Sequence, residues 1–537
     1  MSSQINDTVS PEAVAVTMSE SAAQVTFGEL ESRSRRLAHL LRSRGLETGS
    51  NLAVLLDNCA QYFDVCWATR RAGLYCTPIN WHLGADEAGY IIEDCEATAL
   101  ITTARMQTLL ADLQPRLGPV PTRLVVDGPV EGFEDMDRAI EGYPDQPLPA
   151  ETEGALMFYS SGTTGRPKGI KRDLDATPFG TPGSFDLLVQ SLYGFEPGIV
   201  YLCPAPLYHA APLGWSMAAQ RAGGTVVVME RFDAEATLAA IEKYGVTHAQ
   251  FVPTHFIRML KLGDDVRARY DLSSLRMAVH AAAPCPVEVK QAMIDWWGPI
   301  VYEYYSGSEG VGFCAVGPDE WRARPGTVGK SLRGAVRITG EHGEDLPPGQ
   351  VGQIWFEDSP PFEYHHDPEK TSAAFNDRGW STLGDVGFVD ADGYLFLTDR
   401  VSHMIISGGV NIYPQETEDA LVLHPAVADV AVIGVPDPEM GESVLAVVQP
   451  ADPNLDPDSL AEELDQFCRE RLAGYKCPRG YRFVDELPRL PTGKLLKRKL
   501  RDAFGGATAA TVVGVADSAR IRADRVDRME GVRGRMS

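Results

Sequence analysis

Short apolar runs alternate with longer segments of helical period over residues 25–400, and this alternation limits the fold more than any other feature of the sequence. The runs 51–56, 99–103 and 224–229 have the length of buried strands, whereas residues 28–44 carry apolar side chains three and four positions apart, as amphipathic helices do. Strands that alternate with helices form parallel sheets covered by helices. The sequence therefore predicts an α/β fold, with parallel sheets and helices in a large N-terminal domain.

The pattern changes at about residue 325. Residues 344–356 and 390–399 combine short strand patterns with turns rich in Gly, Pro and Asp, which is typical of a small barrel-like β part. Beyond residue 400, two strand patterns at 427–436 and 443–450 precede a helical pattern at 457–472. We therefore expect a second, small α+β domain at the C-terminal side.

The last part of the chain has two further features. Residues 497–499 are a short basic run, which we interpret as the solvated face of a helix. Residues 504–537 begin with small residues and continue with alternating charges, and this composition predicts a disordered tail.

Charge and cysteine content exclude several classes of protein. The 537 residues have a net charge of −25, which would repel the phosphates of a nucleic acid. No run approaches the roughly 18 apolar residues of a membrane span, and no basic start followed by an apolar block indicates a secretory signal. The nine cysteines are scattered, so we expect reduced thiols and no zinc site. We expect a cytoplasmic enzyme of a small-molecule substrate, as a monomer or homodimer.

The segment 159–169, Tyr-Ser-Ser-Gly-Thr-Thr-Gly-Arg-Pro-Lys-Gly, is the most informative motif. It follows an apolar run at 155–158, so it is predicted to be a strand that leads into a Gly/Ser/Thr-rich loop. Glycines bring backbone N–H groups close to a ligand, and the hydroxyls and Lys168 add donors and positive charge that suit a polyphosphate. It is not a Walker loop, because only two residues separate Gly162 from Gly165.

This loop resembles the phosphate loop of the acyl-adenylate-forming, or AMP-binding, superfamily, which includes acyl-CoA synthetases, peptide-synthetase adenylation domains and luciferases. Four further segments resemble the family's motifs in the family's order, and the resemblance covers roughly residues 20–502. These are Tyr304-Tyr305-Ser306-Gly307-Ser308-Glu309, residues 379–385, residues 399–416 and Pro491-Thr492-Gly493-Lys494. Ser306 departs from the family pattern, which has Gly there.

The resemblance implies ATP and Mg²⁺ as cofactors. Glu309 would bind the Mg²⁺, and Lys494, Ser308 and His209 would be the catalytic residues. Lys494 would reach the α-phosphate from the small domain, Ser308 would donate to that phosphate, and His209 would lie beside the carboxylate. The implied ATP- and AMP-binding residues are Ser160, Ser161, Gly162, Thr163, Thr164, Gly165, Lys168, Ala282, Ala283, Pro284, Tyr304, Tyr305, Ser308, Asp385, Arg400 and Lys494.

The resemblance also implies an acyl pocket, a CoA site and a hinge. The pocket residues would be Tyr208, His209, Trp215, Phe251, Thr254, Ala281, Gly310 and Val311. The CoA residues would be Ser407, Gly408, Gly409, Lys476 and Arg479. His403 stands at the hinge position, where Asp or Lys is common. The implied organisation is an adenylate-forming domain at 1–399, a hinge at 400–404, a mobile C-terminal domain at 405–503 and the tail at 504–537, with no fused carrier domain.

The branch that the chain resembles most contains the fatty-acid, bile-acid and steroid-side-chain CoA ligases. The function implied is ATP-dependent activation of a carboxylic acid as acyl-AMP, with release of pyrophosphate, followed by transfer to CoA as co-substrate. Two alternatives stay open at this point. One is a diazotase that activates nitrite and joins it to an aromatic amine, and the other is a luciferase-like oxidase.

Overall fold

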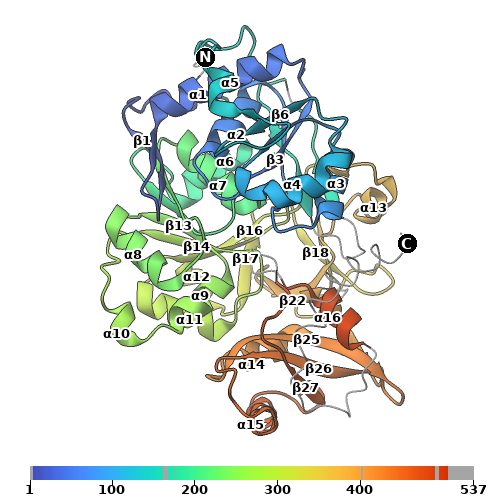
Figure 1. Cartoon of the computed structure of the whole chain (residues 1–537). Coiled ribbons are helices and arrows are strands. Elements are labelled where there is room, and N and C mark those ends of the chain that lie inside the picture. The colour runs from blue at the N-terminus through green and yellow to red at the C-terminus, as the bar shows by residue number, and fades with distance from the viewer. Residues whose placement is uncertain (1–3, 161–166, 175, 401–402, 490–494, 506–537) are drawn as a thin grey trace, which may run out of the picture.

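The computed structural model describes residues 4–160, 167–174, 176–400, 403–489 and 495–505. Figure 1 shows that most of the chain builds two sheets with their helices, while the segment after Ile405 builds a small sheet at one end of the molecule. No helix in these ranges combines the length and the apolar character that a bilayer span requires. The α/β architecture with a large N-terminal part and a small C-terminal part is confirmed.

The first sheet has six parallel strands, and residues that alternate along each strand pack on opposite faces. In β3, Leu52 and Val54 join the core under α1 and α2, whereas Ala53 and Leu55 join the core under α3 and α4. The strands, in sheet order, are β7 (Glu134–Asp135), β6 (Thr122–Val125), β5 (Ala97–Thr102), β3 (Asn51–Leu55), β4 (Tyr75–Pro78) and β8 (Ala155–Leu156). The helices are α1 (Phe27–Ser43), α2 (Gln61–Arg71), α3 (Ala85–Asp94), α4 (Gln107–Leu113) and α5 (Met136–Glu141).

The second sheet has thirteen strands, of which the central ones are parallel. Its first strand, β1, pairs with β12 through Val16 and Val226, although more than two hundred residues separate them. This region contains β2 (Gln24–Thr26), β1 (Val14–Met18), β12 (Thr225–Val228), β11 (Val200–Cys203), β13 (His248–Phe251), β14 (Met277–His280) and β15 (Val301–Tyr305). The helices are α6 (Ser184–Tyr193), α7 (Ala210–Arg221), α8 (Ala234–Tyr244), α9 (Pro253–Leu260), α10 (Asp264–Arg267) and α11 (Val287–Trp297).

The antiparallel strands expected after residue 325 are present, and together with β16, which precedes residue 325, they continue the thirteen-stranded sheet. They are β16 (Cys314–Val316), β17 (Thr327–Ser331), β22 (Leu395–Arg400), β21 (Asp385–Val389), β19 (Gly352–Phe356) and β18 (Val336–Thr339), with α12 (Pro318–Ala323) and α13 (Pro368–Ala373) between them. Among the described residues β18 is paired only with β19, so these strands extend the large sheet without closing a barrel.

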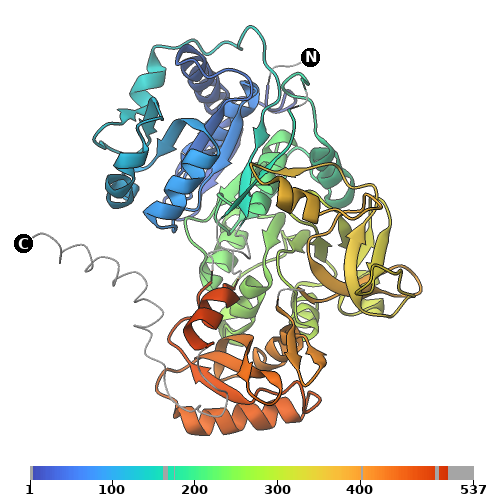
Figure 2. The same cartoon turned by 90° about the vertical axis from the view of Figure 1, so that its right-hand side faces the viewer.

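Two smaller sheets complete the fold. A three-stranded sheet places β10 (Lys168–Lys171) between β9 (Phe158–Ser160) and β20 (Glu363–Tyr364), so the predicted phosphate loop connects two paired strands. The C-terminal sheet lies at the bottom of Figures 1 and 2, apart from the others. It contains β24 (Val410–Ile412), β23 (Ile405–Ser407), β26 (Gly441–Pro450), β25 (Val427–Asp437) and β27 (Gly480–Phe483), with α14 (Pro414–Leu421), α15 (Pro457–Arg469) and α16 (Lys497–Phe504).

Local sequence fixes where individual helices begin. At α1, Thr26 Oγ1 accepts a hydrogen bond from the Glu29 backbone N–H at 3.2 Å, and Glu29 Oε2 accepts one from the Thr26 N–H at 2.8 Å. At α15, Asp456 accepts from the Ser459 N–H at 2.9 Å, and Pro457 takes the first helical position. Such caps satisfy backbone donors that the helix leaves open, and each contributes about 1 kcal/mol.

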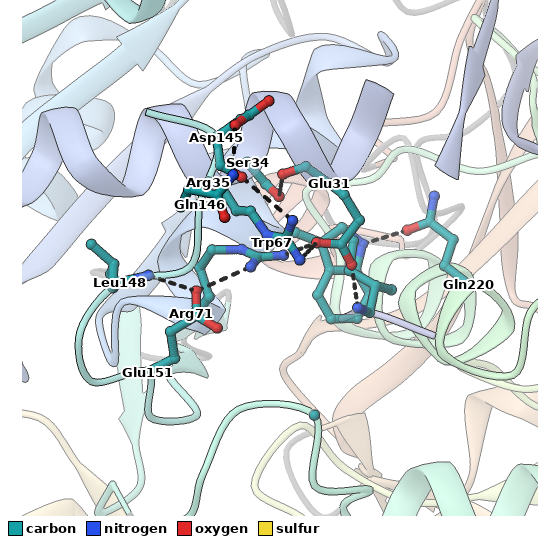
Figure 3. Close-up of polar contacts among 12 residues, drawn as sticks. Glu31, Ser34, Arg35, Trp67, Arg71, Asp145, Gln146, Leu148, Glu151 and Gln220 are labelled. Atoms are coloured by element: carbon teal, nitrogen blue, oxygen red, sulfur yellow. Dashed lines mark hydrogen bonds and ion pairs between the residues drawn. The ribbon is translucent and has the colours of Figure 1, made fainter. Parts of the chain in front are cut away.

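A buried ionic cluster joins α1, α2 and the segment before β8. The Arg71 side chain has no exposed surface, and its guanidinium lies 2.7 Å from Glu31 Oε2 and 3.1 Å from Glu151 Oε1. The Phe179 ring lies against the same guanidinium, at 4.5 Å. Figure 3 shows that the two carboxylates approach Arg71 from different sides. One cation therefore connects three segments of the N-terminal part.

Candidate active site

A cavity of about 740 Å³ lies where the strand ends of the large sheet meet the C-terminal part. It brings together residues from twelve helices and strands, and thirteen of the predicted site residues line it. They are Ser160, Lys168, Thr254, Ala282, Ala283, Pro284, Tyr304, Tyr305, Ser308, Glu309, Asp385, Arg400 and His403. Lys168 and Asp385, which the sequence places more than two hundred residues apart, face one space.

On the cavity wall, the buried carboxylate of Asp385 contacts two donors. The Tyr305 hydroxyl donates to Asp385 Oδ2 at 2.6 Å, and Arg400 Nε lies 3.1 Å from Asp385 Oδ1. Asp385 and Arg400 face each other because β21 and β22 pair in that register. Burial and the Asp385 charge raise the pKa of Tyr305 well above its usual value, so this hydroxyl stays protonated as a donor.

The backbone beside this carboxylate is strained. Ala282, directly after β14, has φ of +76°, and residues 282–284 are exposed on the cavity wall. A left-handed conformation costs a non-glycine residue roughly 1–2 kcal/mol, and such strain persists mainly at functional sites. Ser306, which departs from the family pattern, also lines the cavity, and its hydroxyl donates to the Gly312 carbonyl at 2.8 Å.

The cavity wall also holds Lys168 and Glu309. Tyr364 connects them, because its hydroxyl donates to Glu309 Oε1 at 2.9 Å and its ring lies 4.7 Å from Lys168 Nζ. Burial and the nearby Lys370 lower the pKa of Lys168. Ser308 is exposed, and its carbonyl accepts from Arg172 at 3.3 Å. A carboxylate beside a cation at the mouth of a cavity fits Mg²⁺ bound to phosphate oxygens, since Mg²⁺ prefers oxygen ligands.

Several predicted residues lie outside the described part of the chain. These are the phosphate-loop residues Ser161, Gly162, Thr163, Thr164 and Gly165, the catalytic Lys494, and most of the predicted tail. The residues that flank them are described. Ser160 and Lys168 line the cavity on either side of the loop, and Arg489 and Leu495 do so around Lys494.

Most of the predicted acyl-pocket residues do not line this cavity. Tyr208, Trp215, Phe251, Ala281 and Val311 are buried. Trp215 and Phe251 lie in the two hydrophobic cores on opposite faces of the large sheet. Trp215 is connected to the cavity through Tyr304, because its Nε1 donates to the Tyr304 hydroxyl at 3.3 Å. His209 is the half-buried residue that precedes α7. A role of these residues and of Gly310 in acyl binding stays a prediction.

The five predicted CoA residues also lie away from the cavity. Ser407, Gly408 and Gly409 form the end of β23 and its turn, where both glycines have positive φ. Lys476 forms an ion pair with Glu416, and the Arg479 backbone N–H donates to the Val444 carbonyl at 2.7 Å. Their role stays a prediction as well.

The structure corrects the interpretation of the basic run and adds residues that the sequence did not indicate. Arg498 and Lys499 are exposed, but Lys497 is only 5% exposed, because it turns into the cavity and lies 2.7 Å from Glu418. Tyr364 was also missed. The only feature of the sequence that could have indicated Tyr364 was an aromatic residue in a polar, turn-rich segment. Its contacts with the site depend on the pairing of β20 with β10.

Comparisons with known proteins agree with this geometry. The family model "AMP-binding enzyme" matches residues 4–359, and the model "AMP-binding enzyme C-terminal domain" matches residues 416–494. The feruloyl-CoA synthase of an Amycolatopsis species is 36% identical over 503 residues, which cover 93% of this chain and 97% of that protein.

Solved structures show the same fold. The amide bond synthetase of Marinactinospora thermotolerans is 30% identical with a TM-score of 0.78, over 93% of this chain and 98% of that one. The o-succinylbenzoate CoA synthetase of Bacillus subtilis, solved with its acyl-adenylate intermediate, is 28% identical with a TM-score of 0.75, over 92% and 96% of the two chains. The protein therefore belongs to the AMP-binding enzymes, in their acid–CoA ligase branch.

Proposed function

We propose that this enzyme activates a carboxylic acid with ATP to form an acyl-AMP and pyrophosphate, and then transfers the acyl group to CoA. The observation that supports this most is the cavity, in which cationic, carboxylate and hydroxyl groups face one space from both parts of the chain. The first step brings two anions together, so it needs preorganised positive charge and oriented donors. The cavity supplies both.

The two groups of polar residues in the cavity support a proposal for how the nucleotide lies. Asp385 and Arg400 would bind the ribose hydroxyls, with Tyr305 and the strained backbone at Ala282 beside the adenine. The phosphates would extend toward Lys168 and the loop that precedes it. Mg²⁺ held by Glu309 would neutralise charge on the phosphate oxygens. Tyr364 would fix the position of the Glu309 carboxylate through its hydrogen bond.

The position of the predicted CoA residues fits a second step on another face of the small domain. Ser407, Gly408 and Gly409 lie outside the cavity, and the exposed apolar side chains Ile406 and Met440 lie around this turn. We propose that rotation of the small domain brings this face to the acyl-AMP. Hinge residues absorb such a rotation through changes in a few backbone angles.

His403 is the proposed pivot, because it follows the last strand of the large sheet and contacts it, with Nδ1 3.3 Å from Asp399 Oδ1. Proline fixes φ near about −65°, so His403→Pro should lower thioester formation by roughly tenfold or more while adenylation persists. The two half-reactions are measured separately, with His403→Ala as the control that keeps the backbone free. Equal losses in both steps would contradict a hinge at this residue.

We further propose that the acid carries an aromatic ring. The names of two relatives, a feruloyl-CoA and an o-succinylbenzoate CoA synthetase, denote aromatic acids. On the cavity wall, the Tyr304 ring stacks on Phe313 with centroids 5.1 Å apart and rests against Trp215. Such an aromatic group favours a flat apolar ligand over a flexible chain.

Pyrophosphate release tests the proposal. We expect release that depends on ATP, Mg²⁺ and an aryl acid such as ferulate, and a thioester once CoA is added. Fatty acids and nitrite with an arylamine are run in parallel. Release with nitrite and the arylamine alone would replace the proposed function by N–N bond formation, and a preference for fatty acids would overturn only the aromatic assignment.

A further inference from the structure

Two adjacent histidines meet a glutamate from a distant part of the chain. Glu96 lies in the turn between α3 and β5, and His365 and His366 directly follow β20. One ligand atom of each residue lies within 4.8 Å of the other two. The pairing of β20 with β10 brings the segments together, and the His365 backbone N–H donates to the Gly169 carbonyl at 2.8 Å.

The backbone at this cluster is bent in an unusual way. Neighbouring side chains in an extended segment point in opposite directions. His366 has φ of +55°, and the two histidine rings lie on the same side, with centroids 3.7 Å apart. Glu96 also has positive φ, +53°. Non-glycine residues adopt this conformation at a cost in free energy, so two such residues at one cluster indicate a functional constraint.

The imidazole of His365 has an atom that needs a partner. Its Nε2 is buried and has no hydrogen-bond partner among the described residues. A neutral imidazole nitrogen is the form that binds a metal ion.

A carboxylate lies behind the second histidine. Asp94 Oδ1 is 3.6 Å from His366 Nδ1, and Asp94 Oδ2 accepts a hydrogen bond from the Tyr159 hydroxyl at 2.6 Å. Metal-binding histidines commonly have a carboxylate next to the ring nitrogen that does not bind the ion. This carboxylate fixes the tautomer and the orientation of the ring. Tyr159 would in turn fix the carboxylate.

We propose that His365, His366 and Glu96 bind one divalent transition-metal ion of the zinc type, separate from the proposed Mg²⁺ site. Two imidazoles and a carboxylate suit Zn²⁺, Co²⁺ or Ni²⁺, whereas Mg²⁺ takes oxygen ligands. Bonds of about 2.0–2.1 Å would bring the ligand atoms to roughly 3.4 Å from one another, so the side chains close in on binding. Glu96 is exposed and can make this movement.

The ion would connect the α3–β5 turn to the strand that holds Tyr364. Because Tyr364 donates to Glu309 and lies against Lys168, the metal would fix the strand from which the proposed phosphate site is built. The site does not depend on the proposed reaction, and metal binding can be measured without substrate.

The test uses the full chain after chelator treatment, in excess Mg²⁺, titrated with Co²⁺ and Zn²⁺. We expect one equivalent of Co²⁺ with the visible absorption of a nitrogen-ligated ion, and its displacement by Zn²⁺. His365→Ala with His366→Ala should abolish that equivalent. The matched controls His342→Ala and Glu87→Gln replace an exposed histidine and an exposed glutamate elsewhere, and both should bind like the wild type.

Milder variants keep the test decisive if the double variant misfolds. Asp94→Asn should weaken binding by about 10–100-fold, the usual effect of removing a carboxylate behind a metal-bound histidine. Glu96→Gln should weaken it by roughly tenfold or more. Far-UV circular dichroism checks that each variant is folded. The proposal would be overturned if the wild-type protein binds no more Co²⁺ than the double variant does. It would also be overturned if Glu96→Gln and Asp94→Asn are both folded and bind Co²⁺ with unchanged affinity.

Discussion

Replacing Lys494 with alanine is expected to slow acyl-AMP formation by about 10²–10³, because it would remove one preorganised cation from a reaction between two anions. This corresponds to roughly 3–4 kcal/mol of activation free energy. Lys494 lies outside the described residues, but its neighbour Leu495 lines the cavity. An isolated bridge between Arg489 and Leu495 anchors both ends of the segment there.

The effect should be confined to the first step. The variant given preformed acyl-AMP and CoA should form thioester at nearly the wild-type rate, since another face of the small domain would serve that step. Lys499→Ala is the matched control, because Lys499 is an exposed lysine of the same region. Adenylation that stays within about threefold of wild type, less than about 1 kcal/mol, would show that Lys494 is not the catalytic lysine.

The second large effect concerns stability. Arg71→Met would leave the buried carboxylate of Glu151 without its cation, whereas Glu31 would keep its ion pair with Arg35 at 3.3 Å. Removing one partner of a buried ion pair costs about 3–5 kcal/mol, because the remaining charge stays desolvated. We expect a lower urea midpoint and, by hydrogen exchange, a loss of amide protection centred on α1 and α2.

Two controls separate the lost charge from the lost side chain. Arg105→Ala removes an arginine that pairs with Asp57 but is 70% exposed, so it should cost no more than about 1 kcal/mol. Combining Arg71→Met with Glu151→Gln removes the uncompensated charge and should recover part of the stability. If Arg71→Met shifts the urea midpoint no more than Arg105→Ala does, the buried cluster does not have the role inferred here.

The sequence predicted the positions of individual strands and helices better than it predicted which of them lie next to one another in the fold. The strand pattern at 51–56 became β3 at Asn51–Leu55, and the helical pattern at 28–44 became α1 at Phe27–Ser43. The hydrophobic period indicates which side chains of an element are buried, and it can be read from the order of residues along the chain. It does not report which strands pair, so neither the neighbour of β1 nor the join between the antiparallel strands and the large sheet could be read from it.

The site shows the same limit. Residues inside contiguous motifs, such as Tyr305 and Glu309, line the cavity as expected. Tyr364 and Lys497 could not be identified from the sequence. Tyr364 reaches Glu309 because β20 pairs with β10, and Lys497 pairs with Glu418 of α14, and neither contact follows from a sequence pattern. Trp215 and Phe251 were expected at the acyl pocket, but large apolar side chains fit a core equally well, and that is where they lie.

The position of β1 has a consequence for synthesis on the ribosome. β1 ends at Met18, and its partner β12 begins at Thr225, so about 200 more residues must be translated before the strand has its partner. At about 5–20 residues per second, this takes roughly 10–40 s. During that time, only β2 can pair with β1, and the other edge of this apolar strand stays open. The nascent chain is therefore most exposed to aggregation and to chaperone binding at its first strand, until β12 has left the ribosome.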